Sequence, residues 1–255
     1  MKNLSSVADI RAWRKSARGT VGFVPTMGAL HAGHAELLKQ ARQNCDHVVL
    51  SIFVNPTQFN DPKDLEKYPR TLEADLEIAR QAGVDLTWTP TAEELYADQY
   101  ALKVVETGIS GQLEGAYRPG HFEGMLTVVL KLLQVVQADI AYFGEKDYQQ
   151  LKLIERMAQA FFLPTRIQPV PTVREADGLA MSSRNLRLTE SERNLAPKLF
   201  AILKSATSAS LAFQQLTNLG FKVDYVEDWQ NRRLAAAHLG SVRLIDNIEI
   251  PGGSR

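Results

Sequence analysis

Two histidines lie three residues apart in the stretch PTMGALHAGH (residues 25–34), directly after an apolar run that ends in proline. In an open parallel α/β sheet, ligands collect at the carboxyl ends of strands, where the next helix presents amide groups and the positive end of its dipole. We expect this stretch to lie there, with Gly28 and Gly33 permitting close approach to a ligand. His31 and His34 then lie on one side of a helix start and can donate hydrogen bonds to phosphate oxygens.

Two other interpretations of this histidine pair stay open at this point. A zinc pair is one, although no third ligand stands at a recognisable spacing and HExxH is absent. A purely structural role, such as helix capping, is the other.

Polar residues also follow a second apolar run, in FVNPTQF (residues 53–59) after HVVLSI. Asn55 and Gln58 emerge from that strand end, beside the histidine loop if the sheet is parallel, and Pro56 stiffens the turn. An amide side chain both donates and accepts, which suits a hydroxyl-bearing acid. A plain turn amide is the alternative.

The stretch FGEKDYQQL (residues 143–151) repeats this arrangement at a third strand end. Gly144 lies at the turn, and Lys146 and Asp147 begin the next helix. Lys146 is a compact cation that can offset phosphate charge, and Asp147 can orient it or a ribose hydroxyl. A solvated surface ion pair is the alternative.

Hydroxyl and guanidinium donors occur together in MSSRN (residues 181–185). Ser182, Ser183 and Arg184 on a flexible segment suit closure over a triphosphate. A domain hinge with a helix cap is the other interpretation. In YRPGHFEGM (residues 117–125), Arg118 and His121 flank a proline and a glycine, which predicts a shaped loop before a helix, and we assign no chemical step to either.

Alternating strand and helix patterns must position these residues. Strands with short connections to helices indicate right-handed crossovers and a parallel sheet. The predicted strands are 20–26, 47–55, 84–90, 138–144 and 165–173, and the predicted helices are 34–44, 71–83, 122–136 and 147–162. We therefore expect an α/β fold: a Rossmann-like domain over residues 1–176 and a smaller α+β lid domain over 177–255.

The two ends of the chain are predicted as follows. The N-terminus is typical of a short amphipathic helix with Val7, Ile10 and Trp13 on one side. In the smaller domain we expect a helix over 189–210 and two strands, 221–227 and 241–250. The last five residues, PGGSR, are expected to fray.

Composition excludes several classes of function. The 255 residues carry 29 basic and 29 acidic side chains, and this zero net charge argues against a nucleic-acid binder. The longest apolar stretch is too short for a bilayer and contains Lys131, so we expect no membrane span. A single cysteine, Cys45, and the lack of a leader-like segment predict a cytoplasmic protein. GxxxxGK[ST], GxGxxG and a nucleophile elbow are all absent.

The stretch TMGALHAGH resembles the HxGH signature of the nucleotidyltransferase superfamily, and its flanks are similar to the pantothenate synthetase family. Five further blocks resemble that family in the expected order, up to about residue 190 and weakly to RLIDNIEI: FVNPTQF, YPRTLEADL (68–76), YRPGHFEGM, FGEKDYQQL and READGLAMSSRN (174–185). Arg184 stands where the related synthetase loop usually has lysine. The region between residues 205 and 227 looks shorter than the family pattern. A shorter region here would change the size of the lid domain and the contacts of a dimer.

The resemblance implies condensation of pantoate with β-alanine through a pantoyl adenylate, with ATP and Mg²⁺, in a homodimer. It implies His31, His34, Lys146 and Arg184 as catalytic residues and Gln58, Gln150 and Asn55 as ligands of pantoate or β-alanine. The ATP-binding residues it implies are Met27, Gly28, Ala29, Leu30, His31, Ala32, Gly33, His34, Gly144, Glu145, Lys146, Asp147, Val173, Met181, Ser182, Ser183 and Arg184. No protein ligand of the metal is implied.

Two competing functions remain. The first is another HxGH enzyme that transfers a nucleotidyl group to a small phosphate-bearing substrate and keeps the nucleotide in its product. The second is a noncatalytic module that senses ATP, against which Lys146, Gln150 and the intact MSSRN argue.

Overall fold

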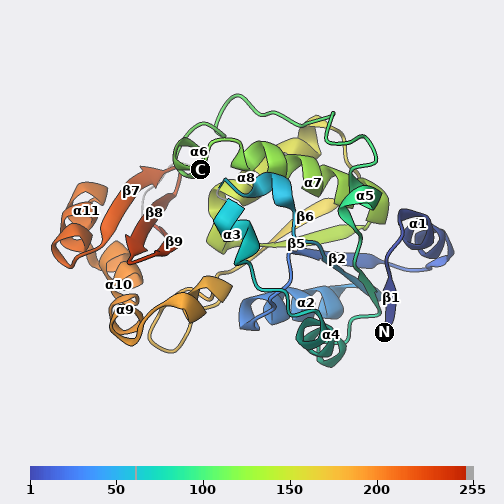
Figure 1. Ribbon diagram of the computed structural model, residues 1–255, viewed down its shortest axis with the longest axis horizontal. Coiled ribbons are helices and arrows are strands. Elements are labelled where there is room, and N and C mark those ends of the chain that lie inside the picture. The colour runs from blue at the N-terminus through green and yellow to red at the C-terminus, as the bar shows by residue number, and fades with distance from the viewer. Residues whose placement is uncertain (61, 251–255) are drawn as a thin grey trace. The chain divides into compact units, whose positions relative to one another are not determined.

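The computed structural model describes residues 1–60 and 62–250 and has two compact units (Figure 1). The N-terminal unit comprises Met1–Glu145 and Gln149–Val170, and the C-terminal unit comprises Lys146–Tyr148 and the chain from Pro171 onward. The domain boundary at 176/177 stays a prediction. The expected fraying of residues 251–255 concerns residues outside the described part of the chain.

The N-terminal unit contains a six-stranded parallel sheet in the order β1-β4-β3-β2-β5-β6. Its strands are β1 (Lys2–Leu4), β2 (Val21–Thr26), β3 (His47–Ile52), β4 (Leu86–Trp88), β5 (Ile140–Gly144) and β6 (Arg166–Val170). From β2 the chain proceeds outward through β3 to β4 and then returns to β5 on the other side of β2. The strand order therefore reverses between β2 and β5, which is where ligands bind in open α/β sheets.

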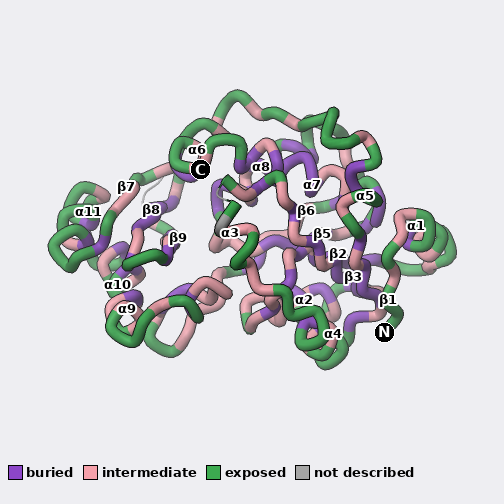
Figure 2. Tube along the Cα trace, viewed as in Figure 1, coloured by how far each residue is buried: buried purple, intermediate pink, exposed green. Residues whose placement is uncertain are grey.

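Helices cover both faces of this sheet. They are α1 (Val7–Ser16), α2 (Ala32–Asn44), α3 (Pro62–Glu66), α4 (Leu72–Gln81), α5 (Ala92–Leu95), α6 (Glu114–Tyr117), α7 (His121–Val136) and α8 (Tyr148–Ala160), with 3₁₀ turns η1 (Pro56–Gln58) and η2 (Glu145–Asp147). On one face, Leu38 of α2 and Ala79 of α4 pack with Val24 and Leu50 of the sheet. The central strands are buried (Figure 2), as their apolar, β-branched sequences predict.

The C-terminal unit has an antiparallel sheet in the order β7-β8-β9, with helices packed on it. Its strands are β7 (Lys222–Trp229), β8 (Arg232–Leu239) and β9 (Val242–Glu249), and its helices are α9 (Glu190–Leu195), α10 (Lys198–Ser205) and α11 (Ala209–Asn218), preceded by the 3₁₀ turn η3 (Ser183–Arg187). The predicted class, a Rossmann-like α/β domain with a smaller α+β domain, is confirmed. Across the described residues, no helix has the length and apolar character needed to cross a bilayer.

Three details of the sequence prediction are wrong. The N-terminal segment contains strand β1 before its helix, because Lys2–Leu4 pairs in parallel with Leu86–Trp88 of β4. The helix expected over 189–210 is divided between three helices: Pro197, which has no N–H to donate, starts α10, and the Ser208 hydroxyl caps α11. The C-terminal sheet has a third strand, β8.

Candidate active site

The histidine loop connects the end of β2 with the start of α2, as the sequence predicts. The Thr26 hydroxyl donates to the Ser51 carbonyl (2.8 Å) and so ties the end of β2 to β3. Gly28 and Ala29 follow with φ of 80° and 51°, the left-handed region that reverses the chain direction. His31 is then the N-cap of α2.

His31 and His34 form a reciprocal capping box at this helix start. Nδ1 of His31 accepts from the Gly33 amide (3.1 Å), and Nδ1 of His34 accepts from the His31 amide (3.3 Å). An accepting ring nitrogen carries no proton, so the neutral rings hold theirs on Nε2. Each imidazole therefore presents an Nε2–H donor, and the ring centroids lie 4.2 Å apart.

This geometry bears on both alternatives for the pair. The capping role is real, but it occupies Nδ1 and leaves the donor function to Nε2, so the two roles coexist. In the described part of the chain, no three His, Cys, Asp or Glu side chains come together as a metal site. The structure therefore gives no support to a zinc site.

Gln58 lies at the carboxyl end of β3, the strand next to β2, and is almost fully buried. Asn55 donates from Nδ2 to Gln58 Oε1 (3.2 Å), which fixes the orientation of the Gln58 amide. Gln58 Nε2 is then directed toward Met27 Sδ, 2.9 Å away at the start of the histidine loop. The donor side of Gln58 therefore faces the histidine loop.

Asn55 itself has both of its polar atoms engaged within the protein. Its Nδ2 also donates to the Gly124 carbonyl (3.2 Å), while its Oδ1 accepts from the hydroxyls of Thr57 (3.1 Å) and Tyr96 (2.8 Å). Asn55 is only 1% exposed. Burial raises the pKa of the Tyr96 phenol, so this hydroxyl remains a donor at neutral pH. This arrangement favours a role for Asn55 in holding Gln58 over direct substrate contact.

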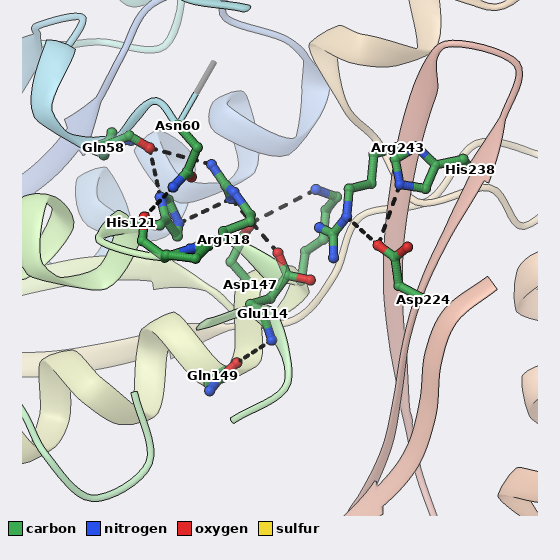
Figure 3. A network of polar contacts seen from close by, with 12 residues as sticks. Gln58, Asn60, Glu114, Arg118, His121, Asp147, Gln149, Asp224, His238 and Arg243 are labelled. Atoms are coloured by element: carbon green, nitrogen blue, oxygen red, sulfur yellow. Dashed lines mark hydrogen bonds and ion pairs between the residues drawn. The ribbon is translucent and has the colours of Figure 1, made fainter. Parts of the chain in front are cut away.

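Arg118 and His121, for which the sequence suggested no step, hold the backbone of Gln58 (Figure 3). His121 Nδ1 lies 2.8 Å from the Gln58 carbonyl and donates to it, so Nε2 accepts from Arg118 (3.0 Å). Glu114 lies 3.7 Å from the same guanidinium. The motif YRPGH predicts the shape of this loop, but no sequence signal indicates a contact with a carbonyl 63 residues away.

The remaining expected site residues are divided between the two units: Gly144, Glu145 and Gln150 belong to the N-terminal unit, and Lys146, Asp147, Val173 and Met181–Arg184 to the C-terminal unit. Lys146 Nζ lies 3.8 Å from Asp147 Oδ2, and the Lys146 carbonyl accepts from Asn247 Nδ2 (3.0 Å). Gly144 and Glu145 end β5 and begin η2, and Gln150 is half-buried in α8.

The MSSRN segment forms the 3₁₀ turn η3 with Ser182 as its N-cap, since the Ser182 hydroxyl accepts from the Arg184 amide (3.2 Å). Directly before this turn, the Met181 amide donates to the Val173 carbonyl (3.0 Å). Asn185 donates to the Ala180 carbonyl (3.1 Å) and to Glu175 (3.0 Å). The structure thus brings Val173 and Met181 together beside the donors of this segment.

Comparison with known proteins identifies the family. The family model described as Pantoate-beta-alanine ligase matches residues 2–249. The chain belongs to the pantoate-beta-alanine ligase family.

Relatives of this family match over nearly the whole chain. The pantothenate synthetase of Bdellovibrio bacteriovorus is 58% identical over 247 residues, covering 97% of this chain and 98% of that protein. The crystal structure of pantothenate synthetase from Thermus thermophilus has a TM-score of 0.91 at 42% identity, covering 98% of this chain and 99% of that one. The Francisella tularensis pantoate-beta-alanine ligase, complexed with beta-gamma ATP and beta-alanine, has a TM-score of 0.93 at 41% identity, covering 98% and 97%.

These matches extend the family resemblance beyond residue 190 into the C-terminal unit. Because the chain spans almost the full length of the Bdellovibrio and Thermus proteins, it is not shortened relative to these family members. Of the four expected catalytic residues, His31 and His34 belong to the N-terminal unit and Lys146 and Arg184 to the C-terminal one. Their joint action on one ligand stays a prediction.

Proposed function

We infer that this chain is an ATP-dependent ligase that joins pantoate to β-alanine and releases AMP and pyrophosphate. The observation that carries the proposal is the capping pair of His31 and His34, with its Nε2–H donors at the switch point of the sheet, in a chain of the pantoate-beta-alanine ligase family. The related Francisella protein, solved with ATP and β-alanine, supports the same pair of ligands.

In the first half-reaction the pantoate carboxylate attacks the α-phosphorus of ATP and pyrophosphate leaves. Both reactants are anionic, so the protein must align them and stabilise charge on the nonbridging and leaving oxygens. In this proposal His31 and His34 donate from Nε2 to phosphate oxygens, and Lys146 and Arg184 supply positive charge. The donors of the histidine pair are held by the capping bonds before ATP arrives, so they need no reorganisation during the step.

ATP enters as its magnesium complex in this proposal. Mg²⁺ keeps several waters and binds mainly through substrate phosphates with few protein ligands. In this proposal the metal arrives with its nucleotide and is held mainly by the phosphates. The family resemblance implies further ATP ligands, each proposed within its own unit: Met27 to Gly33, Gly144 and Glu145 in the N-terminal unit, and Asp147, Val173 and Met181 to Ser183 in the C-terminal unit.

In the second half-reaction the β-alanine amine attacks the acyl carbon of the adenylate, and AMP leaves. Gln58 Nε2–H is the proposed donor to pantoate, oriented by Asn55, and Gln150 is a second proposed pantoate ligand. The mixed anhydride reacts readily with water, so the C-terminal domain is proposed to act as a lid that excludes it. A homodimer in the cytoplasm completes the proposal.

The test is a substrate-omission assay on the purified chain. ATP, Mg²⁺, pantoate and β-alanine are mixed, and each is left out in turn while AMP, pyrophosphate and pantothenate are quantified. We expect one AMP per pantothenate with all four present, and pantoate-dependent pyrophosphate release without β-alanine. A product that retains the nucleotide would indicate the nucleotidyl-transfer alternative, and ATP unchanged after prolonged incubation would indicate a sensing module.

A further inference from the structure

Asp75 is a buried carboxylate beneath the histidine loop, in the first turns of α4. It is 2% exposed. Its Oδ2 accepts from the Ala29 amide (3.0 Å) and its Oδ1 from the Leu30 amide (2.7 Å), while the Thr71 hydroxyl donates to Oδ1 (3.2 Å). The carboxylate therefore binds two successive amides of the loop, and it lies within the YPRTLEADL block, for which the sequence suggested no role.

The loop segment that Asp75 holds has an unusual backbone. Ala29 has φ of 51°, in the left-handed region that residues with a Cβ rarely adopt. Gly28, with φ of 80°, fits so closely that a Cβ there would lie 2.9 Å from Asp75 Oδ2. Such a conformation persists only where its surroundings fix it, and the two bonds from Ala29 and Leu30 do so.

The same bonds determine what the loop can offer to an anion. Because the Ala29 and Leu30 amides donate to Asp75, they are directed away from a ligand, and the loop must use other donors. Leu30 directly precedes His31, the N-cap whose ring and amide both take part in the capping box. Holding the Leu30 amide therefore holds the backbone at the N-cap, from which the orientation of both imidazoles follows.

We propose that Asp75 is a positioning residue for the adenylation step. It holds the left-handed turn at Ala29 and Leu30 and so aims the Nε2–H donors of His31 and His34 at the phosphates. This inference rests on the proposed function, since it takes those imidazoles as the phosphate donors. Asp75 itself contacts no substrate in this proposal.

The test compares Asp75→Asn with Asp139→Ala. Asp139 Oδ2 accepts from the Val21 amide (2.8 Å) at the amino end of β2 and from Arg14 (3.3 Å), so an alanine at 139 removes a similar amide bond at the opposite end of the same strand. An asparagine at 75 has one oxygen and cannot accept from both loop amides as a carboxylate does. Melting temperature, the folded fraction, and kcat and KM for pantoate-dependent pyrophosphate release are measured for each variant.

We expect kcat per folded molecule of Asp75→Asn to fall roughly tenfold to a hundredfold, because small misplacements of reacting groups have effects of that size. KM for pantoate should be unchanged, and Asp139→Ala should lose stability without losing kcat. A wild-type kcat per folded Asp75→Asn molecule would overturn the positioning role.

Two further measurements keep the result interpretable. If Asp75→Asn does not fold, Asp75→Glu, which keeps both carboxylate oxygens but displaces them from the Ala29 and Leu30 amides by one methylene, takes its place, and a kcat equal to wild type overturns the proposal. If the wild-type chain itself releases no pyrophosphate with pantoate, the proposed function fails, whereas activity in wild type with none lost in the variants refutes only the role of Asp75.

Discussion

The assignment of separate roles to the two ring nitrogens of His34 predicts that folding and catalysis respond differently to substitution. In His34→Asn, the side-chain oxygen can occupy the place of Nδ1 and still accept from the His31 amide. The other ring nitrogen, with its Nε2–H donor, is lost. His34→Ala removes both functions. The pair of variants therefore separates the cap from the proposed phosphate donor.

The expected magnitudes follow from the contacts. A helix N-cap or reciprocal capping bond contributes about 1 kcal/mol to stability. The bond from the His31 amide to His34 Nδ1 is long for a hydrogen bond (3.3 Å), so we expect its contribution to stability to lie below that value. Loss of one preorganised transition-state donor costs on the order of 3 kcal/mol, or about a hundredfold in kcat. We therefore expect both variants to lose about a hundredfold in kcat, and only His34→Ala to lose stability.

Two measurements on each variant check this expectation. Urea unfolding gives the change in free energy, and pantoate-dependent pyrophosphate release, measured with saturating ATP, gives kcat. His31 remains in place in both variants, which limits the effect to one donor. Near-normal pyrophosphate release by His34→Asn would refute the assignment of Nε2–H to the phosphates, and equal destabilisation of the two variants would refute the assignment of Nδ1 to the cap.

Two more predictions concern other contacts. His121→Asn keeps a donor near the place of Nδ1 for the Gln58 carbonyl, so its KM for pantoate should stay close to wild type. His121→Leu loses this hydrogen bond and should raise the KM for pantoate roughly fivefold. Equal KM values for the two variants in steady-state kinetics would contradict this. The Arg193 guanidinium lowers the pKa of Asp177 below its ordinary value of 3.8, so its contribution to stability is present above that value and is lost as pH falls through the lowered pKa. Asp177→Asn should therefore flatten the acid limb of stability measured by circular dichroism, and an unchanged acid limb would argue against it.

The parts of the fold that sequence predicts are those with a strong apolar pattern. β2, β3 and β5 are buried on both faces and have continuous apolar runs, and α7 is apolar over most of its length. β1 and β8 lack such a signal. β1 is three residues long and starts with two polar ones, and β8 contains three alanines and two arginines, so only pairing with neighbouring strands makes them strands.

The residues of the candidate site also fall into those that a local sequence pattern marks and those that it does not. Glycine, histidine and amide residues after strand ends mark His31, His34 and Gln58 from sequence, because strand ends of a parallel sheet meet at one edge. Asp75 and His121 are different, since each acts on a backbone group more than forty residues away. Nothing in a local pattern encodes such a contact, and the sequence accordingly marks their blocks as family-like without giving either residue a role.

The three-residue spacing of the histidines has a physical cause in the helix start. His31 is the N-cap, so Ala32, Gly33 and His34 are the first three helical positions, and the third is the one whose side chain reaches back to the N-cap amide. A histidine one residue later would lie one position beyond that reach and would leave the His31 amide without this acceptor. The spacing that places two imidazoles at the end of β2 is therefore also the spacing that fixes their tautomers, because each must use Nδ1 to cap the helix. The two Nε2–H donors follow from the capping geometry, and a helix that lost its cap would lose the direction of both donors with it.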